Sequence, residues 1–251
     1  MQRINDEKVA LVSIAQWIDH TKLTFSPSED EESSIERLCQ EAKEAGFYAV
    51  CVHPRHVAQA KALLAGTTIK VAAVIGFPEV KTPLNIEQNS LSIGNVPTAN
   101  KIAETRQALT DGADELDIVL PVRRFKEGSR NNDLNLVRNE LLALREAAPY
   151  QALKVILETD LLNPDEINQA VSLCVETGMD MVKTSTGMVE GGSGATPEII
   201  TMLATSLQQL QAPLGIKASG GVKTATQAQT LIQAGATRIG SSNSLALLEI
   251  T

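Results

Sequence analysis

Cysteine is scarce in this sequence. Only Cys39, Cys51 and Cys174 occur among 251 residues, an odd number, and no two of them form a C-x-x-C pair. Neither a disulfide framework nor a zinc knuckle is therefore predicted. A reducing cytoplasm is the expected compartment.

The sequence also lacks an excess of basic residues. It has 22 Lys and Arg against 30 Asp and Glu, which gives a formal net charge of -8. Nucleic acids and anionic membranes favour a basic protein face, so neither is an expected partner. A small soluble substrate fits this charge balance better.

No long hydrophobic run is present. The one N-terminal candidate, VALVSIAQWI at residues 9–18, has only about ten residues, which is too short to cross a bilayer. It follows Asp6, Glu7 and Lys8 and has no small-residue cleavage site, so it does not look like a signal peptide. We interpret it as a short amphipathic N-terminal helix.

Several common catalytic and cofactor motifs are missing as well. The sequence contains no G-x-G-x-x-G turn, no G-x-S-x-G and no H-E-x-x-H. The three histidines, His20, His53 and His56, do not have metal-ligand spacing. Neither an esterase-like triad nor a metal site is predicted.

What the sequence does have is a regular alternation of short apolar runs with helical patterns. Eight runs predict strands, at residues 17–22, 48–52, 70–76, 115–120, 153–158, 181–184, 214–218 and 237–241. The helical segments between them carry start signals, such as Ser34 for one helix and Asn163 with Pro164 for another. Strands that are apolar on both faces, each followed by a helix, predict a parallel sheet covered by helices.

Eight such units in one chain predict a single (β/α)8 TIM-barrel domain over residues 1–251. A doubly wound open sheet is the alternative, although that fold usually carries a G-x-G-x-x-G turn after its first strand. No linker divides the chain. Residues 79–100, with two prolines and mixed polarity, are expected to form an enlarged loop at the barrel mouth.

Two lysines end neighbouring strands of this predicted barrel. Lys183 follows an apolar run in MDMVKTSTGM, and Lys217 has the same setting in LGIKASGG. Active sites of such barrels lie at the C-terminal ends of the strands, so both ammonium groups should lie close together there. At about 5 Å they repel by roughly 3 kcal/mol, which favours a neutral amine able to form a Schiff base. Two lysines that only pair with carboxylates are the structural alternative.

Asp117 lies between Leu116 and Ile118, an unusual place for a carboxylate without a partner. We expect it to pair with a lysine or to relay protons as a general acid and base. Asp19 in WIDHTKL repeats the pattern more weakly and also fits a turn-capping role. Lys154 is placed at the N-terminal end of its strand, which predicts a structural role.

Two glycine-rich corners follow the last two predicted strands. SGGVKT at 219–224 and GSSNS at 240–244 each lead into a helix, so free backbone N–H groups and helix N-termini face the mouth. Loops after strands seven and eight are a frequent phosphate site in these barrels. The corners therefore favour a phosphorylated substrate.

Three of these segments, VKTSTG, IKASGGV and GADELDIVL, together resemble the deoxyribose-phosphate aldolase family of class I aldolases. The resemblance extends over almost the whole chain through IDHTKL, AVCVHP, VAAVIGFP, LKVILET and RIGSS. It implies reversible cleavage of 2-deoxy-D-ribose 5-phosphate to acetaldehyde and D-glyceraldehyde 3-phosphate, in deoxynucleoside catabolism. It also implies that no metal or organic cofactor takes part.

The resemblance implies roles for individual residues. Lys183 matches the Schiff-base lysine, Lys217 the second lysine that perturbs it, and Asp117 the proton-relay aspartate. Matches to substrate-binding positions are Asp19, Cys51, Thr186, Gly187, Gly220, Gly221, Gly240 and Ser242. The chain departs from the family at Met188, where some members have lysine, and at Lys223, where arginine is common. Fewer directed cationic contacts to a phosphate group are therefore expected.

Two other functions stay open at this point. One is a different Schiff-base barrel, such as a transaldolase-like enzyme or an aldolase for larger sugars. The other is a non-catalytic phosphosugar-binding barrel, although a binding protein has no need of the lysine pair and Asp117. A homo-oligomer is expected for a barrel of this size, with a dimer as one form, but no stripe of residues identifies the interface.

Overall fold

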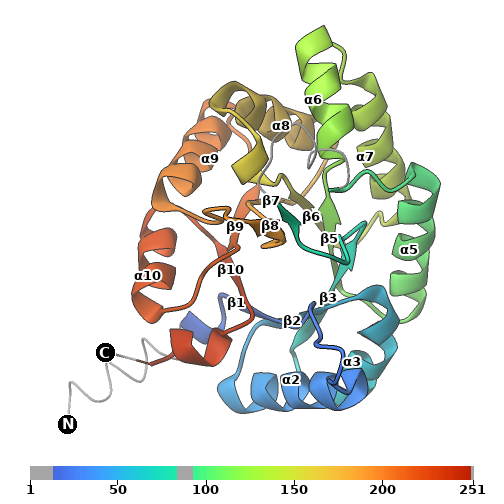
Figure 1. Cartoon of the computed structure of the whole chain (residues 1–251), viewed down its shortest axis with the longest axis vertical. Helices are drawn as coiled ribbons and strands as arrows, with labels where there is room; N and C mark the ends of the chain where they lie inside the picture. Colours follow the sequence, from blue (N-terminus) through green and yellow to red (C-terminus); the bar gives the residue numbers. More distant parts are fainter. Residues whose placement is uncertain (1–13, 84–92, 250–251) are drawn as a thin grey trace.

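The computed structural model describes residues 14–83 and 93–249. Eight parallel strands close into one barrel in the order β1-β10-β9-β7-β6-β5-β3-β2 (Figure 1). Their bounds are β1 (Ile18–Thr21), β2 (Ala49–Val52), β3 (Lys70–Ile75), β5 (Glu115–Val119), β6 (Ala152–Ile156), β7 (Met181–Lys183), β9 (Gly215–Ser219) and β10 (Arg238–Ser241). The eight predicted strands are thus confirmed, and the alternative of an open doubly wound sheet is wrong because β1 pairs with β10.

Helices connect successive strands and form an outer ring around the barrel (Figure 1). They are α2 (Glu31–Ala45), α3 (Val57–Leu63), α5 (Thr98–Thr110), α6 (Val122–Asn131), α7 (Asn135–Ala147), α8 (Pro164–Glu176), α9 (Pro197–Gln209) and α10 (Ala225–Gln233). Three short 3-10 helices are η1 (Pro54–His56), η2 (Thr159–Leu161) and η3 (Ser244–Leu247). Within residues 14–83 and 93–249, no helix is long and apolar enough to span a membrane.

Side-chain caps decide where two of these helices begin. The side chain of Asn163 accepts a hydrogen bond from the Glu166 N–H, and the Glu166 side chain accepts one from the Asn163 N–H, so the predicted start of α8 is confirmed. Helix α2 begins at Glu31, three residues before the expected Ser34. The reason is that Asp30, not a later serine, accepts the hydrogen bond from the Ser33 N–H and caps the helix.

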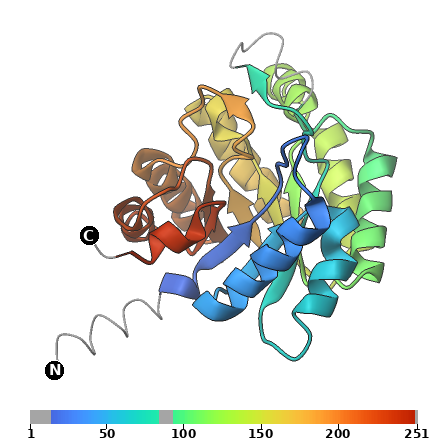
Figure 2. The same ribbon diagram turned by 60° about the horizontal axis from the view of Figure 1, so that its bottom comes forward.

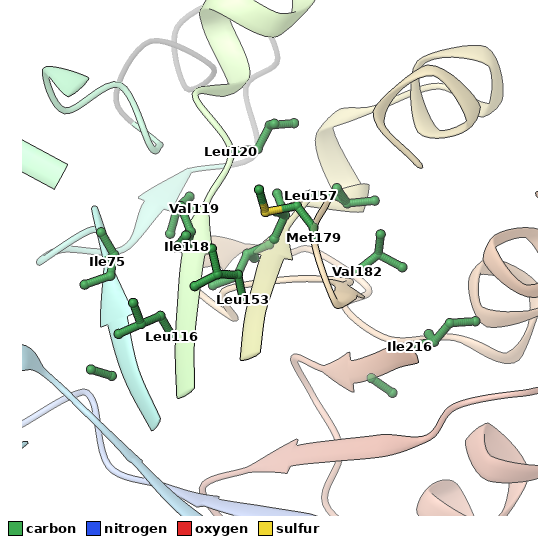
Figure 3. Close-up of a cluster of buried hydrophobic side chains, with 14 of the residues drawn as sticks. Ile75, Leu116, Ile118, Val119, Leu120, Leu153, Leu157, Met179, Val182 and Ile216 are labelled. Atoms are coloured by element: carbon green, nitrogen blue, oxygen red, sulfur yellow. The ribbon is translucent and has the colours of Figure 1, made fainter. Parts of the chain in front are cut away.

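The large hydrophobic core lies between the barrel and the helices, and Figure 3 shows part of it. Side chains of a strand alternate between its two faces, so Leu116 and Ile118 of β5 join this core. The intervening Glu115 and Asp117 contact polar side chains of other barrel strands instead. Charged side chains of several strands therefore meet inside the barrel.

A second, two-stranded sheet stands apart from the barrel sheet. Strand β4 (Thr82–Pro83) pairs in parallel with β8 (Val189–Glu190). In Figure 2, β4 is the small teal arrow beyond one end of the barrel. The expected enlarged loop over 79–100 thus contains a strand, while its residues 84–92 lie outside the described residues. The expected N-terminal helix also falls mostly outside them, in residues 1–13.

Candidate active site

The carboxylate of Asp117 is the centre of the candidate site. The Nζ atoms of Lys183 and Lys217 each lie 2.7 Å from its Oδ2 atom. These two lysines are directly opposite each other on β7 and β9, so the predicted proximity of the pair is confirmed. The Nζ of Lys154 donates to the other oxygen, Oδ1, at 2.8 Å. Asp117 therefore bonds three lysines from three strands.

Around Asp117, six side chains from five strands form a closed ring of alternating charge, which we call the charge ring. Its members, in order, are Asp19, Lys217, Asp117, Lys154, Glu115 and Arg238. The Nη1 of Arg238 lies 2.9 Å from Asp19 and 3.3 Å from Glu115, and the Nζ of Lys154 lies 2.6 Å from Glu115. The ring has three cations and three anions, so its buried charges compensate one another.

The charge ring shifts the pKa values of its members. Burial raises the pKa of Asp117, but Lys154, Lys183 and Lys217 outweigh it and hold this pKa well below its usual value. For Lys217, burial lowers the pKa, but the carboxylates of Asp117 and Asp19 outweigh it and leave the pKa raised. From the sequence, only the repulsion between the two ammonium groups of Lys183 and Lys217 could be considered. The carboxylate oxygen that both lysines share offsets that repulsion.

A cavity of about 440 Å³ opens at the C-terminal ends of the strands, and Lys183 lies on its wall. Six of the eight predicted substrate-binding residues line the cavity with Lys183: Thr186, Gly187, Gly220, Gly221, Gly240 and Ser242. The glycine-rich corners after β9 and β10 therefore meet at one site. Lys183 is the residue that joins this cavity to the charge ring.

The other predicted residues lie deeper in the barrel than the cavity wall. Asp19, Asp117 and Lys217 have no exposed surface, and each belongs to the charge ring. Cys51 is equally buried, with its Sγ 3.9 Å from the Oδ2 of Asp117, and burial raises the pKa of its thiol. Cys51 thus lies beside Asp117, and Asp19 is linked to Asp117 through Lys217; neither lies on the cavity wall.

Sequence reasoning did not predict that three residues take part in the charge ring. Lys154 is the third of five residues in β6 and bonds Asp117, so its predicted place at the end of the strand is wrong. Glu115 and Arg238 were not singled out. The available signal was a charged residue at the start of a short strand, as in ELDIV and RIGS, or inside one, as in ALKVI.

Glu158 is a further buried carboxylate on the cavity wall that the sequence did not reveal. Its backbone is left-handed, with φ 57° and ψ 63°, and its side chain accepts hydrogen bonds from the N–H and the hydroxyl of Thr186. The Thr186 hydroxyl oxygen in turn accepts the N–H of Met188 at 3.0 Å. Burial raises the pKa of Glu158 to about 7, and the bonds from Thr186 oppose this rise. The carboxyl therefore titrates near neutral pH while it holds the segment after β7.

These groups define the chemistry that the site can perform. An amine at the edge of a cavity, bonded to a carboxylate behind it, suits covalent attack on a carbonyl carbon with proton exchange. Backbone N–H groups at the glycine corners suit an anionic group such as phosphate. Among the described residues, no group of three or more His, Cys, Asp or Glu side chains is placed to hold a metal ion.

Comparison with known proteins gives a consistent result. A family model described as DeoC/LacD family aldolase matches residues 13–248. A deoxyribose-phosphate aldolase of Brevibacillus brevis is 41% identical over 237 residues, covering 94% of this chain and 96% of the relative. One from Aciduliprofundum boonei is 40% identical over 239 residues, covering 94% and 96%. The solved tetrameric deoxyribose phosphate aldolase of Aeropyrum pernix superimposes with a TM-score of 0.78 at 29% identity, covering 97% of this chain and 92% of that one.

Proposed function

This chain belongs to the DeoC/LacD family of aldolases, and from that premise we propose that it reversibly cleaves 2-deoxy-D-ribose 5-phosphate to acetaldehyde and D-glyceraldehyde 3-phosphate. The relatives that match over nearly their whole length are deoxyribose-phosphate aldolases. The observation that carries the proposal is the position of Lys183, which lies on the cavity wall and 2.7 Å from the buried carboxylate of Asp117.

In the proposed reaction, Lys183 gives up a proton and its amine then attacks C1 of the open-chain sugar. The carbinolamine that forms loses water and becomes a protonated imine. The carboxylate of Asp117 is close enough to take a proton from the attacking amine and to return it when water leaves. The low pKa of Asp117 means that it passes the proton on and does not retain it.

The imine then withdraws the electrons of the C2–C3 bond. A base removes the proton of the C3 hydroxyl, the C2–C3 bond breaks, and glyceraldehyde 3-phosphate leaves with C3 as its aldehyde carbon. The two remaining carbons stay on Lys183 as an enamine, which is protonated at C2 and hydrolysed to acetaldehyde. Lys217 keeps its proton throughout, because Asp117 and Asp19 stabilise its charge.

The phosphate end of the substrate fits the glycine corners. Gly220 and Gly221 follow β9, and Ser242 follows β10, and all three line the same cavity as Lys183. Backbone N–H groups in such corners bind phosphate oxygens without a side-chain charge. Lys223, also on the cavity wall, adds one cation. The substrate then extends from Lys183 at C1 to the corners at C5.

Release of acetaldehyde from purified protein tests the proposal. We expect cleavage of deoxyribose 5-phosphate, no cleavage of ketose phosphates, and a loss of about a thousandfold or more in Lys183→Leu. Preference for a ketose phosphate supports another Schiff-base aldolase instead. Absence of any turnover, with phosphosugar binding retained, supports the non-catalytic barrel.

Two broader features of the protein are part of the same proposal. The absence of a membrane-spanning helix among the described residues and the family's small phosphorylated substrates fit an enzyme that works in the cytoplasm, in the breakdown of deoxynucleosides. A homo-oligomer fits the tetramer of the Aeropyrum pernix relative. Gel filtration with light scattering measures the number of subunits.

A further inference from the structure

The cavity has two lysines whose charges are not used by the charge ring. Lys81 and Lys223 both line the cavity with Lys183. Lys183 bonds Asp117, whereas neither Lys81 nor Lys223 forms an ion pair with any residue in the described part of the chain. Both have exposed side chains. The mouth of the cavity therefore carries two cations that are available to a ligand.

The two carboxylates on the cavity wall are already engaged elsewhere. Glu158 accepts hydrogen bonds from Thr186. Asp160 accepts the backbone N–H groups of Ser193 and Gly194, at 2.8 and 3.0 Å. These bonds tie Glu158 to the segment after β7 and Asp160 to the segment after β8. Neither acid pairs with Lys81 or Lys223, so both ammonium groups stay unpaired among the described residues of the mouth, although the whole chain has a net charge of -8.

The small sheet of β4 and β8 explains how Lys81 reaches this site from a distant segment. Thr82 pairs with Val189 in a parallel register, and Lys81 and Met188 come one residue before these partners. Neighbouring parallel strands lie about 4.8 Å apart, so Lys81 and Met188 are cross-strand neighbours. Met188 is buried and lines the cavity as well. The pairing of β4 with β8 thus places a lysine beside an uncharged wall position.

We propose that Lys81, held at the mouth by the pairing of β4 with β8, binds the phosphate group of the substrate together with Lys223. This inference rests on the proposed function and adds to it the residue that selects phosphorylated over free sugars. Each ammonium group forms charge-assisted hydrogen bonds to phosphate oxygens, while the glycine corners supply backbone N–H groups. The segment after β3 therefore contributes to substrate specificity.

The test compares cleavage of deoxyribose 5-phosphate with cleavage of free 2-deoxyribose. In Lys81→Met, the ratio of the two kcat/KM values should fall about tenfold, the effect of one lost charged contact. The matched control is Lys70→Met, which removes an exposed lysine at the other end of β3 and should leave the ratio unchanged. Adding Met188→Lys to Lys81→Met should restore part of the ratio, because it returns an ammonium group to the neighbouring position.

Two outcomes overturn this inference alone. An unchanged ratio in Lys81→Met shows that the lysine does not contact phosphate. An equal loss on both sugars shows that Lys81 acts on the shape of the mouth and not on the phosphate group. If the parent protein cleaves neither sugar, the proposed function itself is overturned, and the inference falls with it.

Discussion

Asp117 and Lys154 are directly opposite partners on β5 and β6, and the Nζ of Lys154 lies 2.8 Å from the Oδ1 of Asp117. This bond occupies the carboxylate oxygen that the other two lysines leave free. It also ties Asp117 to Glu115, which lies 2.6 Å from the same ammonium group. Lys154 therefore fixes the orientation in which Asp117 faces Lys183.

Replacing Lys154 tests this positioning role. Lys154→Met keeps most of the side-chain volume but removes the buried cation that Asp117 and Glu115 share. Asp117 then keeps only Lys183 and Lys217, and Glu115 keeps only Arg238, so the free energy of unfolding should fall by up to about 3–5 kcal/mol. Urea unfolding followed by circular dichroism measures the change. Lys70→Met, at an exposed position in β3, should stay within about 0.5 kcal/mol of the parent. Equal stability of the two variants contradicts the role given to Lys154.

Much of the fold follows from local patterns in the sequence. All eight barrel strands lie within a residue or two of the predicted runs, because strands buried on both faces have an apolar pattern that needs no tertiary information. The ends of the helices are harder to predict. For α2, acidic residues before Ser34 compete with it as caps, and Asp30 provides the cap.

The candidate site could be predicted only in part. Lys183, Lys217 and Asp117 could be found because each is a charge in an apolar strand near the predicted mouth. The charge ring could not be predicted. Asp19 and Lys217 are 198 residues apart in the sequence, and they come together only when β1 pairs with β10. The left-handed backbone of Glu158 likewise depends on the packed loops around it and has no signal in LKVILET.

The raised pKa of Glu158 predicts a specific pH dependence of stability. Its carboxyl keeps a proton in the folded state up to about pH 7, whereas the unfolded chain loses it near 4.5. Folding therefore becomes less favourable as pH rises through this window, by at most about 3 kcal/mol. The Gln side chain of Glu158→Gln stays neutral and can still accept a hydrogen bond from the Thr186 N–H. The variant should therefore lack this pH-dependent fall in the free energy of unfolding.

Urea unfolding of the parent and of Glu158→Gln at pH 4 and pH 8 measures the effect. The difference in the free energy of unfolding should move in favour of the variant between the two pH values. The values at pH 4 serve as the control, because the Glu158 carboxyl is then mostly protonated in both the folded and the unfolded protein. A difference that does not change with pH contradicts the assignment of a buried, proton-retaining carboxyl.

The close approach of two loops at the phosphate corner predicts different effects for two glycines. A Cβ at Gly194 lies 2.3 Å from the carbonyl oxygen of Gly220, a cavity residue, whereas a Cβ at Gly191 has nothing within 4 Å. Both have a left-handed backbone, with φ of 65° and 74°, so alanine is similarly strained at either position. Gly194→Ala should raise KM for the phosphorylated sugar by roughly tenfold through displacement of Gly220.

Gly191→Ala is the matched control, and it should raise this KM much less. Steady-state kinetics on both variants, with circular dichroism to establish folding, gives the comparison. Equal values of KM for Gly194→Ala and Gly191→Ala show that backbone strain alone causes the change in KM. In that case the corner around Gly220 does not contribute to binding of the phosphate end.

Chemical trapping of the nucleophile tests whether Lys183 forms the Schiff base. Lys183 is the lysine that both bonds Asp117 and lies on the cavity wall, so acetaldehyde should form its imine there. Borohydride reduces that imine to an N-ethyl lysine, and peptide mapping by mass spectrometry locates it. We expect one ethyl group, on Lys183. An adduct on Lys217, or ethyl groups spread over exposed lysines such as Lys81 and Lys223, contradicts this expectation.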